Sequence, residues 1–181
     1  MSSIVTVPHP VLRQVAKPVT VIDRRVLDTI QNMTRALLSA KDPEGIGLAA
    51  PQIGIPLKIF LIRPDLNKPP VLFINPEITD YSQRQQTPET KKGVYEGCLS
   101  VPHHYSPIKR SMSVTVKYQV LKKVNDKWEM IDKSDVFTGF TAHIIQHEMD
   151  HLNGILFIDH VLAQNSKLYL IKGDVCEEIS L

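Results

Sequence analysis

The stretch QHEMDHL, residues 146–152, is the most informative part of the sequence for the fold and the site. His147 and His151 are four residues apart, so on a helix they lie about 40° apart around the axis and both imidazoles can reach one ion. Glu148 projects at a neighbouring angle, close enough to touch a water on such an ion without binding the ion itself. The stretch therefore predicts a helix that carries two metal-binding histidines and one catalytic carboxylate.

This helix is expected over residues 141–153, with Gly154 directly after its end. Apolar residues occupy both of its sides: Phe140 and Ile144 with the histidines, and Ile145, Met149 and Leu152 opposite them. A helix that is apolar on nearly every face lies buried in the centre of a domain. A chance cluster of His and Glu on the surface is the alternative, but buried histidines beside a buried glutamate are costly unless an ion compensates them.

A catalytic metal site also needs a third protein ligand and an open position for water. Upstream of the helix, Cys98 lies in the segment EGCLS, residues 96–100. A thiolate with two imidazoles suits zinc, iron(II) or nickel. A zinc peptidase would instead take a ligand after the helix, where the candidates are Asp159, His160, Asp174, Glu177 and Glu178. The alternative for Cys98, and our interpretation of Cys176, is a cysteine without a metal.

Composition limits the remaining classes of protein. The chain has 181 residues, 43% of them hydrophobic and 22% charged, which predicts one globular domain over residues 1–181. Lysine and arginine number 21 against 19 acidic residues, and this net charge of +2 is too balanced for an electrostatic nucleic-acid binder. We expect no membrane segment, because every apolar run is short. Two cysteines exclude a disulfide scaffold.

The rest of the chain predicts strands that arrive in hairpins. Asp23 is a candidate N-cap for a helix that ends near residue 41. Alternation and turn signals predict strands over residues 58–62, 71–74, 113–121, 128–131 and 168–171, with a polar surface loop over 79–92. The predicted fold is therefore α+β, with antiparallel sheets packed around the central buried helix that carries HExxH.

Three segments together resemble the signature motifs of the peptide deformylase family: GIGLAAPQ at 45–52, EGCLS at 96–100 and QHEMDHL at 146–152. They occur in the order and spacing of that family, and the resemblance extends from residue 8 to residue 159. It implies a metal-dependent hydrolase that removes the formyl group from the N-terminal formyl-methionine of nascent chains and releases formate. The partners implied are formyl-methionyl nascent peptides and, near them, the ribosome, in a bacterial cytoplasm or, alternatively, in an organelle.

The resemblance also implies roles for individual residues. Cys98, His147 and His151 would hold one divalent ion, with Fe(II) as the physiological metal and zinc or nickel as alternatives. Glu148 would act as general base and then as acid, while Gln52 and the backbone N–H of Leu99 would hold the developing oxyanion. The residues expected to bind the substrate are Ile46, Gly47, Gly97, Phe140, His143 and Ile144.

Several positions leave alternatives open. Glu96 and Arg110 resemble a structural ion pair of the family, although a solvated arginine is the alternative. Tyr105 stands where many relatives carry an arginine that meets the peptide. His143 falls where the family often lines the methionine pocket with an apolar residue, so a deformylase of altered N-terminal specificity is one alternative function. A zinc peptidase with HExxH is another, and a silent peptide-binding relative would be expected to lack Glu148 or Gln52.

Overall fold

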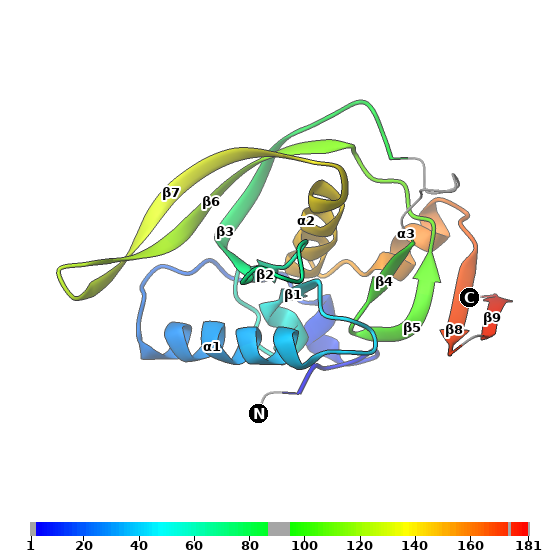
Figure 1. The fold of residues 1–181 in the computed structure, drawn as a ribbon, viewed down its shortest axis with the longest axis horizontal. Helices are drawn as coiled ribbons and strands as arrows, with labels where there is room; N and C mark the ends of the chain where they lie inside the picture. Colours follow the sequence, from blue (N-terminus) through cyan, green and yellow to red (C-terminus); the bar gives the residue numbers. More distant parts are fainter. Residues whose placement is uncertain (1–2, 87–94, 174, 181) are drawn as a thin grey trace.

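The computed structural model describes residues 3–86, 95–173 and 175–180, and this part of the chain is an α+β structure (Figure 1). In chain order its elements are the 3-10 helix η1 (Pro10–Arg13), α1 (Arg24–Ser39), β1 (Gly47–Ala49), the 3-10 helix η2 (Ala50–Ile53), β2 (Ile59–Ile62), β3 (Val71–Tyr81), β4 (Glu96–Cys98), β5 (Val101–Ser106), β6 (Ser113–Val124), β7 (Lys127–Thr138), α2 (Gly139–Leu152), α3 (Phe157–Ala163), β8 (Leu168–Lys172) and β9 (Val175–Ile179).

The strands form two antiparallel sheets, as predicted. One sheet has the order β1-β2-β3-β6-β7, and the other has the order β4-β5-β8-β9. β1 and β4 therefore each stand at the end of their own sheet, with one edge that no described strand pairs. These two short strands carry the glycine-rich segment and the EGCLS segment, respectively.

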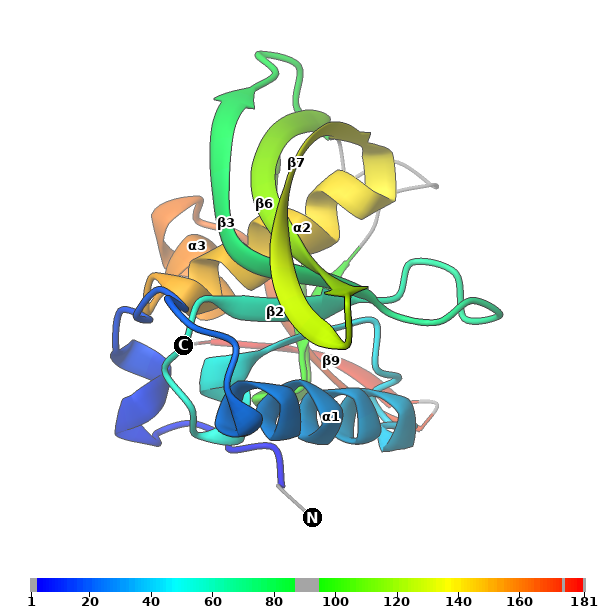
Figure 2. The same cartoon turned by 90° about the vertical axis from the view of Figure 1, so that its left-hand side faces the viewer.

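The predicted metal helix, α2, lies in the centre of the fold (Figures 1 and 2). It packs against β1, β2, β6 and β7. Its Ala142, Ile144, Ile145 and Leu152 share a buried cluster with residues of the five-stranded sheet, among them Phe60, Phe73 and Val116. The expectation of a helix buried on nearly all faces is confirmed. α2 begins two residues earlier than predicted, and Gly154 follows its end with a φ of +71°, a conformation that favours glycine.

A second cluster joins α1 to the same sheet. Val26, Met33 and Leu37 recur along one face of α1 and pack with residues of β1, β2 and β3. Asp23 caps the helix, because its carboxylate accepts a 2.9 Å hydrogen bond from the Val26 N–H. The predicted N-cap is therefore confirmed.

The hairpin of β6 and β7 is longer than predicted. Its strands pair continuously from Ser113 with Thr138 to Val124 with Lys127, and it projects from the body of the molecule (Figure 1). Asn125 and Asp126 form its turn with φ values of 45° and 62°, the left-handed conformation that a two-residue hairpin turn requires. The sequence predicted residues 128–131 of β7 but not the rest of this strand, because most of its side chains are exposed and do not alternate with buried ones.

Other elements were not predicted. Residues 79–81 belong to β3 rather than to a loop, and the part of that predicted loop from residue 87 to 92 lies outside the described residues. Five short elements were not predicted: the strands β1, β4, β5 and β9 and the helix α3. Segments of this length contain too few residues to show a hydrophobic period. In the described part of the chain, no helix has the length and apolar character needed to cross a membrane.

Candidate metal centre and its cavity

α2 and β4 bring three metal-ligating side chains together. Cys98 Sγ lies 3.2 Å from His151 Nε2, which lies 3.2 Å from His147 Nε2, and the ligand atoms all fall within 4.8 Å of one another. All three side chains are buried, so the surface-cluster alternative is wrong. Ligands at tetrahedral angles and about 2.0–2.3 Å from one ion lie roughly 3.3–3.7 Å apart. The donor set therefore fits a single divalent ion.

Glu96 fixes the orientation of His147. Its Oε1 lies 2.8 Å from His147 Nδ1, so this nitrogen donates and the Nε2 lone pair faces the other ligand atoms. Arg110 donates to both oxygens of Glu96, from Nη2 at 2.6 Å and from Nε at 2.9 Å. Burial alone would raise the pKa of Glu96, but Arg110 and His147 outweigh it and hold this pKa well below its usual value. Glu96 is thus a fixed negative charge behind the ligand.

Arg110 is buried, and a solvated arginine is therefore the wrong alternative. Its Nη1 donates to Asp150 at 2.6 Å, and His160 Nε2 lies 2.8 Å from the same Asp150 oxygen. Burial lowers the pKa of Arg110, but Glu96 and Asp150 raise it above its usual value. These contacts connect Glu96 of β4, Asp150 of α2 and His160 of α3 around the ligands.

Glu148 is equally buried but differently surrounded. One of its oxygens, Oε2, has no hydrogen-bond partner among the described residues. Burial raises the pKa of Glu148 to about 7, an effect that nearby His147 opposes. A side chain at position 47 would collide with Oε1 of Glu148, so Gly47 of β1 leaves the space in which this carboxylate sits. The arrangement is suited to a group that takes up and releases a proton near neutral pH.

Gln52 connects the glycine-rich segment to the ligands. It is buried in η2, and its Oε1 accepts a 2.8 Å hydrogen bond from Ala49 N–H. Its Nε2 donates to Ser100 Oγ at 3.2 Å and lies 3.6 Å from Cys98 Sγ. Ser100 N–H also donates to Cys98 Sγ at 3.4 Å. These contacts fix the position of Gln52 and leave a neutral amide beside the ligands.

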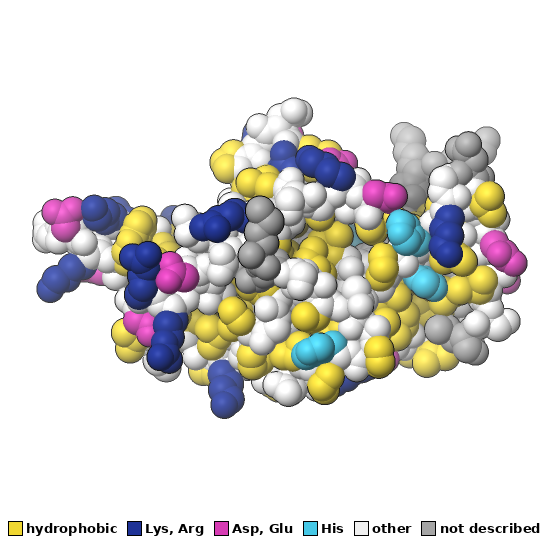
Figure 3. Space-filling view, turned by 90° about the horizontal axis from the view of Figure 1, so that it is seen from below, with side chains coloured by type: hydrophobic (Ala, Val, Ile, Leu, Met, Phe, Trp, Pro, Cys, Tyr) yellow, Lys and Arg dark blue, Asp and Glu magenta, His cyan; other side chains and the backbone are white. Residues whose placement is uncertain are grey.

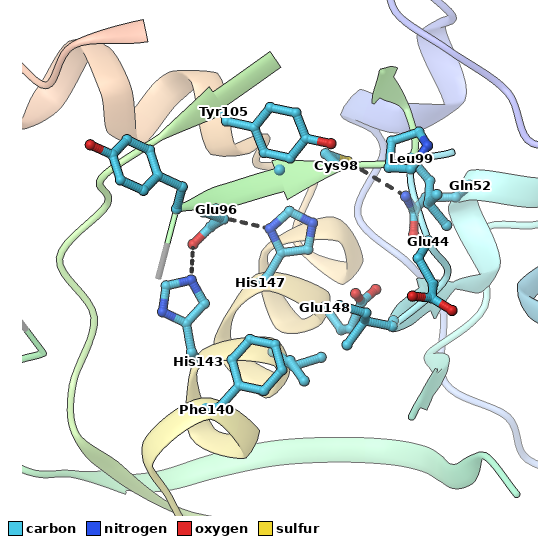
Figure 4. Close-up of a pocket in the computed structure, with 16 residues that line it drawn as sticks. Glu44, Gln52, Glu96, Cys98, Leu99, Tyr105, Phe140, His143, His147 and Glu148 are labelled. Atoms are coloured by element: carbon cyan, nitrogen blue, oxygen red, sulfur yellow. Dashed lines mark hydrogen bonds and ion pairs between the residues drawn. The ribbon is translucent and has the colours of Figure 1, made fainter. Parts of the chain in front are cut away.

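A cavity of about 220 Å³ opens beside these residues (Figure 4). Every site residue predicted from the resemblance lines it except His151, namely Ile46, Gly47, Gln52, Gly97, Cys98, Leu99, Phe140, His143, Ile144, His147 and Glu148. Glu96 and Tyr105 line it as well, together with three residues that sequence reasoning did not single out: Pro43, Glu44 and Tyr95. These three directly flank the first two motifs, which was the available signal.

Tyr105 and His143, the two positions for which the resemblance left the specificity open, also line this cavity. The Tyr105 ring covers Gly97, where an added Cβ would lie 2.6 Å from the ring, so any other residue at this position would displace the ring. His143 is only 3% exposed, so it belongs to the buried wall of the cavity and is not a partly exposed residue at its rim. Its Nε2 lies 2.8 Å from Glu96 Oε2.

The alternative third ligands for a peptidase have other partners. Asp159 pairs with Arg13, His160 with Asp150 and Glu178 with Lys167. Glu177 is exposed, and residue 174 lies outside the described part of the chain. Cys98 and Cys176 are both free, one buried and one exposed. The geometry thus places Cys98, rather than a later carboxylate, beside the two histidines.

Comparison with known proteins gives a consistent result. The family model for polypeptide deformylase matches residues 1–167. A curated peptide deformylase of Pseudothermotoga lettingae is 39% identical over 93% of this chain and 86% of its own length. The crystal structure of peptide deformylase from Thermotoga maritima has a TM-score of 0.71 and 38% identity, over 88% of this chain and 96% of that one. A class I type b peptide deformylase from Acinetobacter baumannii, solved with Met-Ala-Ser bound, has a TM-score of 0.69 and 32% identity, over 87% and 96% of the two chains. The chain belongs to the polypeptide deformylase family.

Proposed function

We propose that residues 1–181 form one metallohydrolase domain in which Cys98, His147 and His151 hold one divalent ion. The enzyme is a peptide deformylase, which removes the formyl group from formyl-methionyl peptides and releases formate. The observation that carries the proposed site is the meeting of three buried ligand residues beside one cavity with the carboxylate of Glu148, whose Oε2 has no hydrogen-bond partner among the described residues.

Glu148 is the proposed proton carrier. When bound, a divalent ion lowers the pKa of its water toward 7 and so supplies the hydrolytic nucleophile. Glu148 takes the proton of the attacking water and then delivers it to the departing amine of the peptide. Its buried Oε2 and its raised pKa of about 7 support both steps, because the group can exist in either protonation state near neutral pH.

Gln52 and Leu99 are the proposed oxyanion donors. Attack on the formyl carbon moves negative charge onto the formyl oxygen. The Nε2 of Gln52, already close to Cys98, and the backbone N–H of Leu99, next to Cys98 in sequence, would donate to this oxygen. Neither donor has to ionise, and one such donor contributes roughly 3–4 kcal/mol to transition-state stabilisation.

The free edges of β1 and β4 are the proposed cradle for the peptide. Both strands end their sheets, and Ile46, Gly47 and Gly97 line the same cavity. An extended peptide between these edges would bond main chain to main chain, which reads little sequence beyond the first residue. Phe140, His143 and Ile144 would then receive the first side chain. The Acinetobacter baumannii relative with Met-Ala-Ser bound supports this class of ligand.

We further propose Fe(II) as the metal in the cell, with zinc or nickel accepted by the same donors. Formylated nascent chains place the reaction beside the ribosome in a bacterial cytoplasm. Figure 3 shows Lys and Arg side chains at the end of the molecule that carries α1 and the β6–β7 hairpin, with Asp and Glu side chains among them, so the charge on this face is mixed, in keeping with the net charge of +2.

The test is anaerobic purification followed by metal analysis and formate release from formyl-Met-Ala-Ser on the same sample. The wild type is expected to carry close to one ion per chain and to release formate. Cys98→Ala should lose most of the metal and the activity, whereas Cys176→Ala, the exposed control, should retain both. An HExxH zinc peptidase would keep its metal in Cys98→Ala, and that result would contradict the proposed ligand set.

A further inference from the structure

His143 places a polar, buried ring in the wall of the cavity. It lies on α2 with Phe140 and Ile144, and all three line the cavity. Figure 4 shows its ring between Glu96 and Phe140. Its Nε2 faces the carboxylate of Glu96, and its Nδ1 has no hydrogen-bond partner within the described part of the chain. This wall is therefore only partly apolar.

The neighbouring carboxylate determines which nitrogen of His143 carries a proton. Nε2 lies 2.8 Å from Glu96 Oε2, and a nitrogen lone pair facing a carboxylate would be repelled, so the proton belongs on Nε2. In the neutral ring Nδ1 is then an acceptor, and it is buried without a partner among the described residues. A buried polar atom without a partner is costly, and a ligand group that donates to it would remove that cost.

We propose that His143 determines specificity and makes the pocket accept N-formyl residues with polar side chains of methionine's length, as well as formyl-methionine. This inference rests on the proposed function, because it assigns the pocket to the first side chain of the peptide. An entirely apolar pocket disfavours a carboxamide, which loses its hydrogen bonds with water. The unpartnered Nδ1 of the imidazole offers a replacement for one of those hydrogen bonds, so the penalty for a carboxamide is smaller here.

The test compares three peptides that differ only at the first residue: formyl-Met-Ala-Ser, formyl-norleucyl-Ala-Ser and formyl-Gln-Ala-Ser. Norleucine and glutamine are apolar and polar isosteres of methionine. The measured quantity is the ratio of kcat/KM for the norleucyl peptide to kcat/KM for the glutaminyl peptide. His143→Leu should raise this ratio about tenfold or more, mainly through the KM of the glutaminyl peptide.

Two further variants separate specificity from structure. His143→Gln keeps a hydrogen-bonding side chain in the wall and should leave the ratio near the wild-type value. His104→Leu makes the matched change on β5 at a histidine that does not line the cavity, and it should not alter the ratio. A purely structural effect of His143→Leu would slow all three peptides alike and leave their ratio unchanged.

The outcomes are distinguishable from failure of the proposed function. If the wild type with a full complement of metal releases no formate from any of the three peptides, the proposed function is wrong. If it acts on formyl-Met-Ala-Ser but His143→Leu changes the ratio by less than twofold, the inference about His143 is overturned and the deformylase function stands. A wild type with no measurable activity on the glutaminyl peptide would overturn the inference as well.

Discussion

Glu96 and Glu148 are two glutamates at one site with nearly the same burial, 3% and 2% exposed, and opposite surroundings. Glu96 receives Arg110 and His147 on its oxygens, and its pKa is held well below the usual value despite burial. Glu148 has an oxygen without a partner in the described part of the chain, and burial raises its pKa to about 7. His147 lies between them (Figure 4).

The difference shows that partners, rather than burial, set the two pKa values apart. Both carboxylates lose water to a similar extent, so desolvation acts on both. Only Glu96 gains a cation and an imidazole N–H in exchange, and it remains charged and immobile. Glu148 keeps the freedom to change its protonation state. Pairs of titratable groups that are pushed apart in this way are typical of sites that separate a structural charge from an acid–base group.

The largest effect is expected from a substitution of Glu148. Glu148→Gln keeps the shape and burial of the side chain and removes its ability to carry a proton. Formate release from formyl-Met-Ala-Ser should fall by about 10²–10⁴-fold, with the metal content unchanged. Glu177→Gln, at an exposed position of β9, is the control and should keep full activity. A Glu148→Gln enzyme with its metal and nearly full activity would contradict the assignment.

A substitution of Glu96 is expected to reduce stability and metal affinity. Glu96→Gln leaves the guanidinium of Arg110 buried with only Asp150 to balance it. Removing one partner of such a buried pair costs roughly 3–5 kcal/mol, and we expect the lower end because Asp150 remains. Metal affinity should fall by about 10–100-fold, because a neutral amide replaces the charged carboxylate that accepts from His147.

Urea unfolding of the metal-stripped protein measures the loss of stability. Competition with a metal indicator measures the loss of metal affinity. The matched control is Glu129→Gln, an exposed glutamate on β7, which should change neither. If Glu96→Gln lowered formate release per bound metal as strongly as Glu148→Gln does, without any loss of stability or metal affinity, the division between a structural and a proton-carrying glutamate would be wrong.

The sequence was sufficient for parts of this site that depend on local geometry. His147, Glu148 and His151 belong to one helix, so their spacing alone predicts that they share a face and border one ion. Cys98 and Gln52 were assigned by resemblance, because the contacts between β4, η2 and α2 join segments about fifty residues apart. Arg110 and His143 could not be settled in the same way. Both residues are buried because they contact Glu96, and Glu96 lies beside α2 only in the folded structure. No local sequence pattern predicts this tertiary contact.

The fold follows the same rule. The helix capped by Asp23 and the strands with alternating apolar residues were predicted, since periodicity and capping are local. β3 was expected to end at Ile74, but it continues to Tyr81 after a register shift at Asn75 and Pro76. A proline usually ends a strand, and here it is accommodated by an irregularity in the pairing with β6.

A carboxylate–guanidinium pair at the surface shows what the buried pair of Glu96 and Arg110 gains from its burial. Arg13 and Asp159 have the same chemistry as Arg110 and Glu96, but their side chains are 50% and 36% exposed. Water screens such a pair, so Arg13→Gln should lower the free energy of unfolding by less than about 1 kcal/mol, and by still less at high salt. The variant leaves Asp159 free to accept its hydrogen bond from Leu156 N–H, and metal content and formate release should not change. Urea unfolding of the Arg13→Gln and Glu96→Gln variants at low and high salt measures the two losses in the free energy of unfolding. Equal losses in the two variants would show that exposure does not govern the strength of these pairs.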